Sequence, residues 1–177
     1  MFAGYSGAGK TTLAERVIPE LRRRGLRVSV VKHAHHKFDI DHPGKDSHRH
    51  REAGAFEVVV ASDRRLALMR EFEQPAELNV HRLIAELDPG VDWVLVEGFR
   101  HSDLPKIEVM RTVELGQAAR PALYPGDDRI CAIATDSAAN LPQPTGLPVF
   151  DLDDAGGVAA WLIKNGARFD YRADSHA

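Results

Sequence analysis

The stretch Gly4-Tyr5-Ser6-Gly7-Ala8-Gly9-Lys10-Thr11 matches the phosphate-binding pattern G-x-x-x-x-G-K-[ST] at every fixed position. Glycines allow the backbone to turn so that successive N–H groups point at one phosphate. The charge of Lys10 suits the outer phosphates, and the Thr11 hydroxyl suits a Mg²⁺ ion that bridges them. The stretch therefore predicts a nucleotide-binding loop, against the plainer alternative of a glycine-rich turn before an ordinary helix.

The residues after this loop predict the helix that the motif requires. Leu13, Val17 and Leu21 recur every four residues, and Gly25 is a suitable C-terminal cap. Residues 27–32 follow as a short, β-branched segment that is typical of a buried strand.

A strand, a helix and a strand in this order predict a right-handed crossover and a parallel sheet. We expect an α/β fold of the P-loop NTPase type, a three-layer sandwich with a mostly parallel central sheet. The sequence favours one domain over residues 1–164 and a polar C-terminal tail over residues 165–177. Only residues 1–3 precede the loop, so the first strand is either very short or lacks residues upstream.

Composition narrows the class of protein. The 177 residues carry a formal net charge of −3, which does not favour a nucleic-acid-binding face. The single Cys131 excludes an internal disulfide and suits a reducing compartment. The chain shows no signal peptide and no apolar run long enough to span a membrane. We therefore expect a cytoplasmic protein without membrane or nucleic-acid partners.

The stretch Glu97-Gly98-Phe99 ends a second buried segment, residues 91–97. In nucleotide-hydrolysing folds of this type, a carboxylate at the tip of the strand beside the loop orients Mg²⁺. Gly98 would let the backbone approach the terminal phosphate closely. We expect Glu97 to join Thr11 around Mg²⁺, although the pattern alone also fits an ordinary strand end.

Residues 33–50 contain six of the nine histidines and several charged groups. The histidines are either ligands of a transition metal or polar loop residues near the phosphates, and no defined zinc spacing is present. Asp46 is a further candidate for the Mg²⁺ site, because the segment leaves the ligand-binding edge of the sheet, but a helix cap explains it equally well.

Three further segments carry structural expectations. Residues 56–61 read as a strand, residues 66–69 as its hairpin partner or a further strand, and residues 77–87 as a helix. Residues 106–111 alternate charged and apolar side chains, which predicts a strand with one solvated face. We expect this strand and the hairpin to be candidate dimer surfaces, since an unpaired edge invites pairing with another chain.

Asp136 follows a buried segment, residues 130–134. A carboxylate at this point can accept hydrogen bonds from guanine, which offers two adjacent donors where adenine does not. A strand-end turn residue is the alternative, and the sequence does not separate the two.

Together these stretches resemble the MobB family of molybdopterin-guanine dinucleotide biosynthesis adapter proteins. The resemblance covers most of residues 1–135 and rests on the phosphate loop extended to Thr12-Leu13 and on four further stretches, Val31-Lys32-His33-Ala34-His35-His36, Pro43-Gly44-Lys45-Asp46-Ser47 with Ala53-Gly54-Ala55, Leu95-Val96-Glu97-Gly98-Phe99 and Lys106-Ile107. The loop pattern alone is common to many unrelated proteins, whereas the histidine stretch followed by Glu97-Gly98-Phe99 is far more specific.

The resemblance implies a GTP-binding homodimer with at most slow GTP hydrolysis. It implies partnership with molybdopterin guanylyltransferase, the enzyme that joins molybdopterin to GMP, and with the molybdenum-insertion enzyme. It also implies that GTP phosphates are held by Ser6, Gly7, Ala8, Gly9, Lys10, Thr11 and Thr12. No catalytic residue is assigned; Arg100 is more simply a surface arginine.

Other classes remain open at this stage. A small-molecule kinase that uses ATP would need a lid with arginines, and Arg64, Arg65 and Arg70 offer one. A metal-chaperone GTPase would use His33, His35, His36, His42, His48 and His50. A structural module with a relic loop would bind no nucleotide.

Overall fold

The computed structural model describes residues 1–34, 38–112 and 120–172, which divide into two compact units. Unit 1 comprises Met1–His33 with Asn79–Ala177, and unit 2 comprises Ala34–Leu78. Unit 1 contains the phosphate loop. The prediction of one domain over residues 1–164 stays a prediction.

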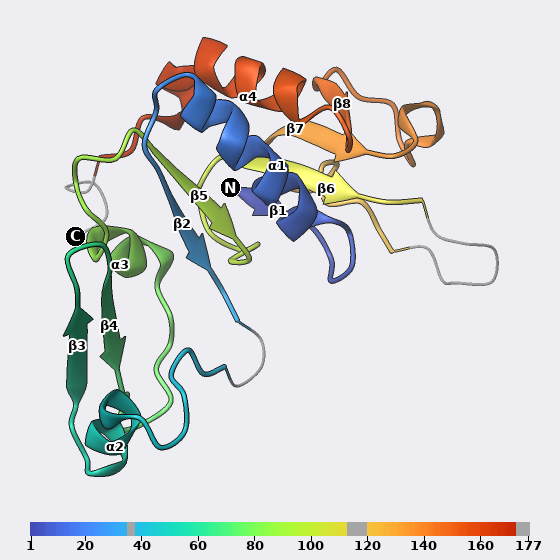
Figure 1. Cartoon of the computed structure of the whole chain (residues 1–177). Coiled ribbons are helices and arrows are strands. Elements are labelled where there is room, and N and C mark those ends of the chain that lie inside the picture. The colour runs from blue at the N-terminus through green and yellow to red at the C-terminus, as the bar shows by residue number, and fades with distance from the viewer. Residues whose placement is uncertain (35–37, 113–119, 173–177) are drawn as a thin grey trace. The chain divides into compact units, whose positions relative to one another are not determined.

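A six-stranded sheet forms the centre of unit 1, in the order β2-β5-β1-β6-β7-β8 (Figure 1). Every pairing in it is parallel, which confirms the predicted α/β class. Its strands are β1 (Phe2–Ala3), β2 (Val28–Lys32), β5 (Trp93–Glu97), β6 (Lys106–Met110), β7 (Ile130–Thr135) and β8 (Val149–Asp151).

The first strand comprises two residues of this sequence and lies inside the sheet, between β5 and β6. Phe2 is in register with Glu97 of β5 on one side and with Ile107 of β6 on the other. Phe2 is 2% exposed and Ala3 is 1% exposed, so two residues suffice to anchor the strand. The phosphate loop therefore starts from a buried, doubly paired position.

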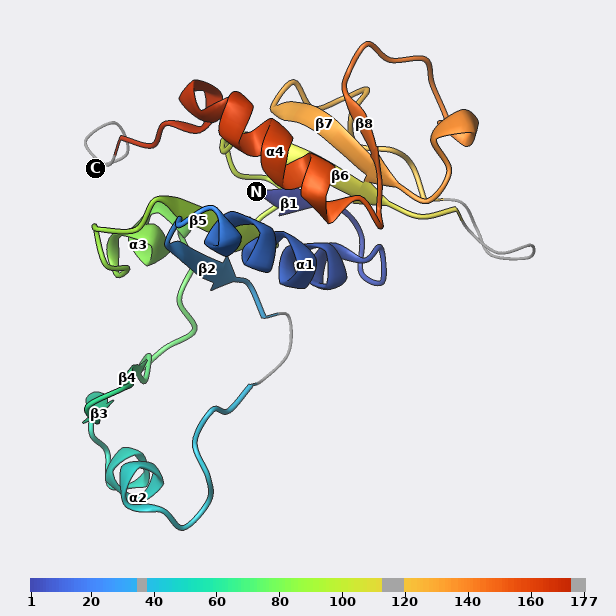
Figure 2. The ribbon, with the colours of Figure 1, turned by 45° about the horizontal axis from the view of Figure 1, so that its top comes forward.

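Helices α1 (Lys10–Arg23) and α4 (Ala155–Lys164) lie side by side on one face of this sheet (Figure 2). The apolar stripe predicted for α1 is buried there with Leu95. The opposite face receives Val96, which packs with α3 (Val80–Ala85). Because neighbouring residues of a strand point to opposite faces, Leu95 and Val96 define the two outer layers of the sandwich.

Helix α3 is shorter than the helix predicted over residues 77–87. The side-chain oxygen of Asn79 accepts hydrogen bonds from the N–H groups of His81, at 2.8 Å, and Arg82, at 3.4 Å. This N-cap sets the start of the helix at Val80, three residues after the predicted start at residue 77. Two 3-10 turns, Ala138–Asn140 and Gly166–Phe169, complete unit 1.

The surroundings of β6 contradict the solvated face that was predicted for this strand. The alternation over residues 106–111 predicted a solvated face, but Lys106 is 2% exposed and Glu108 is 1% exposed. Lys106 Nζ pairs with Asp127 Oδ2 at 2.7 Å, and the Glu108 carboxylate accepts hydrogen bonds from the N–H groups of Leu123, at 2.8 Å, and Tyr124, at 2.7 Å. The strand also lies between β1 and β7, so it is not an edge and cannot serve as the predicted dimer surface.

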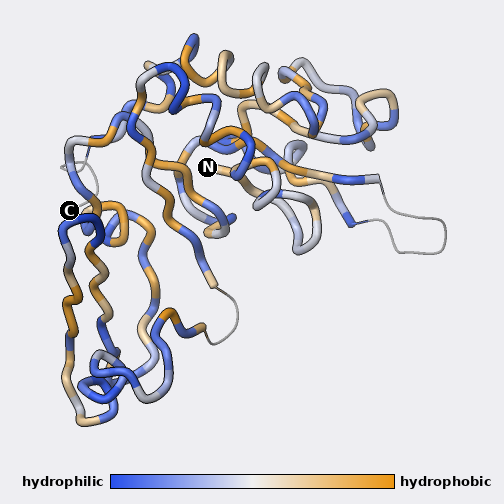
Figure 3. The backbone as a smooth tube through the Cα atoms, viewed as in Figure 1, coloured by the Kyte–Doolittle hydropathy of each residue, from blue (hydrophilic) through white to orange (hydrophobic). Residues whose placement is uncertain are grey.

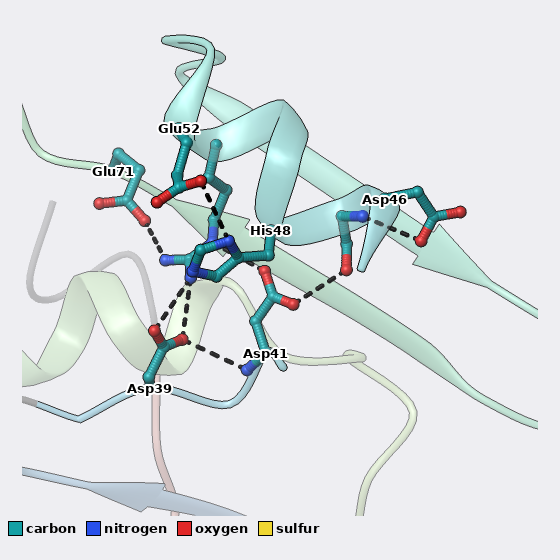
Figure 4. A network of polar contacts seen from close by, with 8 residues as sticks. Asp39, Asp41, Asp46, His48, Glu52 and Glu71 are labelled. Atoms are coloured by element: carbon teal, nitrogen blue, oxygen red, sulfur yellow. Dashed lines mark hydrogen bonds and ion pairs between the residues drawn. The ribbon is translucent and has the colours of Figure 1, made fainter. Parts of the chain in front are cut away.

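Unit 2 contains helix α2 (Asp46–Glu52) and the antiparallel pair β3 (Glu57–Ala61) and β4 (Leu66–Arg70), which confirms the predicted hairpin. Arg51 organises polar contacts within it: its guanidinium pairs with Asp39 and Asp41, each at 2.9 Å, and with Glu71 at 2.6 Å (Figure 4). This partly exposed charge network connects α2 to the segment before it and to the end of β4.

Many apolar side chains of unit 2 are exposed, and the hairpin strands are hydrophobic along much of their length (Figure 3). The exposed large apolar residues of this unit are Phe38, Ile40, Phe56, Val59, Val60, Leu66, Leu68, Phe72 and Leu78. Among the residues that the structure describes, no helix is long and apolar enough to cross a membrane.

Candidate functional site

The phosphate loop runs from β1 to α1 in the conformation that its glycines permit. Gly4, Gly7 and Gly9 have φ angles of 143°, 80° and 99°, which side chains rarely adopt. A side chain at Gly4 would also collide with the carbonyl oxygen of Val109 in β6. Gly9 is the N-cap of α1, so the free N–H groups of the first helical turn are available to a phosphate.

Lys10 lies across the loop. Its Nζ donates a hydrogen bond to the Tyr5 carbonyl oxygen at 2.8 Å. Burial lowers the pKa of the Lys10 ammonium below its usual value; the Glu97 carboxylate opposes this shift, and the charges of Lys32 and Arg120 add to it. The loop therefore concentrates positive charge, which a bound polyanion would stabilise.

Thr11 and Glu97, the two residues expected around Mg²⁺, lie within hydrogen-bond distance of each other. Thr11 Oγ1 donates a hydrogen bond to Glu97 Oε1 at 2.6 Å, and Lys32 Nζ lies 3.6 Å from Glu97 Oε2. Glu97 ends β5, directly beside β1, because the carboxyl ends of parallel strands meet at one edge of the sheet. A hydroxyl and a carboxylate are oxygen ligands that Mg²⁺ accepts, so these two residues fit a Mg²⁺ site.

The turn after Glu97 is tightly constrained. Gly98 has a φ of 95°, and the next residue, Phe99, has a φ of 48°. A Cβ on Gly98 would lie 2.6 Å from the Cβ of His33, whose ring stacks on Phe99 with centroids 4.7 Å apart. The N–H group of His33 donates to the Glu97 carbonyl at 2.9 Å. The first residue of the histidine stretch thus packs against the turn that the sequence assigned to the terminal phosphate.

The remaining residues of the loop and of the first turn of α1 differ in their surroundings. Gly7 has open space around its Cα, and Ala8 is buried with its N–H group bonded to the Tyr5 carbonyl at 3.2 Å. The Ser6 carbonyl accepts a hydrogen bond from Arg120, and Thr12 lies exposed in the first turn of α1. Their predicted role in phosphate binding stays a prediction.

Three arginines lie near the loop; sequence reasoning missed Arg111 and Arg120 and interpreted Arg100 as a surface residue. Arg120 Nη1 donates to the Ser6 carbonyl at 3.1 Å, and its guanidinium lies 5.2 Å from the centre of the Tyr5 ring. The guanidinium of Arg100 lies 5.5 Å from the centre of the same ring. Arg111 lies against Gly9. Arg111 follows β6 directly, so the strand-end rule that identified Glu97 could have identified it as well.

Asp136 follows β7, and its carboxylate is engaged. Its Oδ1 accepts hydrogen bonds from the backbone N–H group of Thr112, at 2.8 Å, and from the Thr112 hydroxyl, at 2.7 Å. Burial alone would raise the pKa of Asp136, but these hydrogen bonds, with help from the Arg111 charge, hold the pKa below its usual value. Base recognition by Asp136 stays a prediction.

Asp46 begins α2 in unit 2, where its carboxylate accepts from the Ser47 N–H group at 3.0 Å. Its expected part in the Mg²⁺ site is therefore still a prediction. His48 Nδ1 lies 3.4 Å from Glu52 Oε2 on the same helix (Figure 4), whereas His35 and His36 lie outside the described residues. Over residues 1–34, 38–112 and 120–172, no group of three His, Cys, Asp or Glu side chains is arranged to hold a metal ion.

Comparison with known proteins gives consistent matches. The model of a family described as molybdopterin guanine dinucleotide synthesis protein B matches residues 1–136. The molybdopterin-guanine dinucleotide biosynthesis adapter protein of Escherichia coli is 40% identical over 164 residues, which cover 92% of this chain and 90% of the relative. The protein of the same name in Haemophilus influenzae is 45% identical over 160 residues, covering 90% and 84%.

The fold has close counterparts among solved structures. The crystal structure of a MobB homologue from Bacillus stearothermophilus aligns with a TM-score of 0.66 at 26% identity. The alignment covers 92% of this chain and 93% of the other. The sheet and its loop are therefore a shared architecture, and not a peculiarity of this sequence.

Proposed function

We propose, starting from the fact that the chain belongs to the molybdopterin guanine dinucleotide synthesis protein B family, that it is a GTP-binding adapter protein. In this role it assists the attachment of GMP to molybdopterin during molybdenum cofactor biosynthesis. Its relatives in Escherichia coli and Haemophilus influenzae carry the adapter name, and the family match confirms the resemblance seen in the sequence.

One observation supports nucleotide binding above the others: the 2.6 Å hydrogen bond that joins Thr11 to Glu97 at the mouth of the phosphate loop. It brings a motif hydroxyl and a strand-end carboxylate to one point, beside the ammonium of Lys10. We propose that this point holds Mg²⁺, that Gly98 approaches the terminal phosphate, and that Ser6 to Thr12 hold the phosphates of GTP. Mg²⁺ would neutralise phosphate charge and fix the orientation of the outer phosphates.

We expect GTP hydrolysis to be slow at most. Among the residues that the structure describes, Glu97 is the one carboxylate hydrogen-bonded to the loop Gly4–Thr11. Engaged with Mg²⁺, it would not be available to orient an attacking water. An adapter that binds GTP without consuming it quickly is consistent with this arrangement.

Homodimerisation through the hairpin β3–β4 is part of the proposal. Among the described residues, each strand of the pair has one edge that is not paired with another strand. The side chains of Val59 in β3 and of Leu66 and Leu68 in β4 are exposed. Burying such side chains against a second copy would stabilise the dimer. Sedimentation velocity should show a dimer at micromolar concentration, and a monomer would refute this part.

The proposed partners are molybdopterin guanylyltransferase and the molybdenum-insertion enzyme, and the proposed location is the cytoplasm. The adapter names of the relatives support an interaction with enzymes of this pathway. Co-purification of the tagged chain with each enzyme, in the presence and absence of GTP and Mg²⁺, tests these interactions.

Calorimetric titration tests the nucleotide. The wild-type protein and a Lys10→Ala variant are titrated with GTP and, separately, with ATP, both with Mg²⁺. We expect GTP to bind the wild type and Lys10→Ala to lose it. A preference for ATP would favour the small-molecule kinase instead, and binding of neither nucleotide would refute the proposed function.

A further inference from the structure

A guanidinium group that lies outside the phosphate-binding motif contacts the loop at Gly9. Arg111 directly follows β6, and a Cβ placed on Gly9 would lie 3.3 Å from Arg111 Nε and 3.5 Å from Nη2. These are ordinary to tight contact distances, so no other side chain separates the guanidinium from the loop backbone. Gly9 is also the N-cap of α1, next to the free N–H groups of the first helical turn.

Arg111 and the Mg²⁺ ligands approach the loop from opposite sides. Strand β1 lies between β5 and β6. Glu97, at the end of β5, contacts Thr11, and Arg111, just beyond β6, contacts Gly9. If Mg²⁺ and the terminal phosphate occupy the β5 side, the phosphate chain of a bound nucleotide reaches the β6 side with its inner phosphates.

The backbone next to Arg111 is held in place. The adjoining residue, Thr112, donates two hydrogen bonds to Asp136 Oδ1, at 2.8 Å from its backbone N–H group and at 2.7 Å from its hydroxyl. These bonds join the end of β6 to the end of β7. They fix the point from which the Arg111 side chain extends, so less conformational freedom is lost when the guanidinium binds an anion.

The charge of Arg111 acts on the Asp136 carboxylate, which is already occupied by two hydrogen bonds from Thr112. Among the residues that the structure describes, no carboxylate lies within ion-pair distance of its guanidinium. Lys10, Lys32 and Arg120 add positive charge around the same loop, and Glu97 is the carboxylate that faces them. Cations gathered in this way repel one another until a polyanion binds between them.

We propose that Arg111 is a nucleotide-binding residue whose guanidinium contacts the inner phosphates, α and β, of the nucleotide held by the loop. A planar guanidinium can donate two parallel hydrogen bonds to a phosphate, which a lysine cannot. The inference rests on the proposed function, because it assigns a residue to the same nucleotide site. It also identifies a separate part of that site, since the contact involves neither Mg²⁺ nor the terminal phosphate.

Titrations with GTP and GDP, both with Mg²⁺ and at one ionic strength, test this assignment on Arg111→Ala and Arg111→Lys. Losing a charge-assisted contact should weaken both nucleotides by the same factor, about 10- to 100-fold. Arg111→Lys should recover part of the lost affinity, because lysine keeps the positive charge but cannot donate two parallel hydrogen bonds. Arg22→Ala is the matched control, since it removes the same charge from the exposed end of α1 and should bind both nucleotides like the wild type.

Several outcomes would overturn the assignment. If Arg111→Ala binds GTP and GDP within about threefold of Arg22→Ala, the guanidinium does not contact phosphates. A loss confined to GTP would place it at the terminal phosphate instead. A lower melting temperature with unchanged affinity would make Arg111 a structural support of Gly9. If Arg111→Ala does not fold, Arg111→Lys and Arg111→Gln decide by the same criteria.

The result also separates this inference from the proposed function. A wild-type protein that binds neither GTP nor GDP refutes both. A wild type that binds GTP, with binding lost in Lys10→Ala but kept in Arg111→Ala, refutes the role of Arg111 alone.

Discussion

Exchanging Glu97 for glutamine should uncouple nucleotide binding from Mg²⁺. Glutamine has nearly the same shape, so its side-chain oxygen can still accept the hydrogen bond that Thr11 donates over 2.6 Å. The exchange removes the negative charge and, with it, the ion pair to Lys32 at 3.6 Å. The Lys32 side chain is 54% exposed, so losing this ion pair should cost less than about 1 kcal/mol.

Two effects of opposite sign set the expected magnitude. With Mg²⁺ present, losing a charged acceptor of the metal shell should cost about 1.5–3 kcal/mol, or about 10- to 100-fold in Kd for GTP. Without Mg²⁺, a carboxylate roughly 6 Å from a phosphate repels it by about 0.7–2.8 kcal/mol at an effective dielectric constant of about 20–80. Glu97→Gln should therefore bind GTP more weakly than the wild type in Mg²⁺ and more tightly in its absence.

Calorimetric titration of both proteins with GTP, in excess Mg²⁺ and in EDTA at equal ionic strength, measures the four affinities. The informative quantity is the ratio of the Kd in EDTA to the Kd in Mg²⁺, which should fall strongly in the variant. An unchanged ratio would show that Glu97 takes no part in the Mg²⁺ site, even if both affinities drop together.

Three further substitutions test the site and its support. Gly98→Ala should lower the free energy of unfolding by about 1–3 kcal/mol in a urea experiment and weaken GTP binding, because the new Cβ would lie 2.6 Å from the Cβ of His33 at a φ of 95°. A variant as stable as the wild type would contradict the proposed backbone strain. Glu108→Ala should lose about 2–5 kcal/mol of unfolding free energy, since the buried N–H groups of Leu123 and Tyr124 lose their acceptor; a loss under about 1 kcal/mol would mean that water replaces it. The lowered pKa of Asp136 stabilises the fold above the unfolded-state pKa of about 4, and this stability is lost as the pH falls through the lower folded-state pKa. Asp136→Asn should therefore show less acid destabilisation than the wild type in melts between about pH 6 and pH 2, and parallel profiles would contradict the shift.

The features that the sequence indicated follow either from neighbouring residues or from a general rule of parallel sheets. The phosphate loop is defined by neighbouring residues, and its conformation follows from the glycines at positions 4, 7 and 9. The approach of Glu97 to Thr11 followed from one general rule, that parallel strands end at a common edge. The same rule applied to residue 111 would have indicated Arg111, which directly follows β6 and lies against Gly9.

The predictions that failed depended on partners distant in the sequence. The alternation in β6 indicated a solvated face, because nothing near Lys106 or Glu108 shows that Asp127 and the backbone at Leu123 and Tyr124 compensate their charges. The polar contacts of unit 2 were equally hidden, since Arg51 contacts side chains up to 20 residues away. Asp46, Asp136 and the histidines keep the status of predictions, because their roles depend on ligands.

The two-residue strand β1 has a consequence for how the protein forms during synthesis. Phe2 pairs with Glu97 and Ile107, which lie 95 and 105 residues further along the chain. Parallel pairings across such separations form late, because a long chain must first be ordered to bring the ends together. The loop after β1 therefore takes its final place only once β5 and β6 have emerged from the ribosome, so any nucleotide bound there would have to wait for the chain to be made at least through Met110.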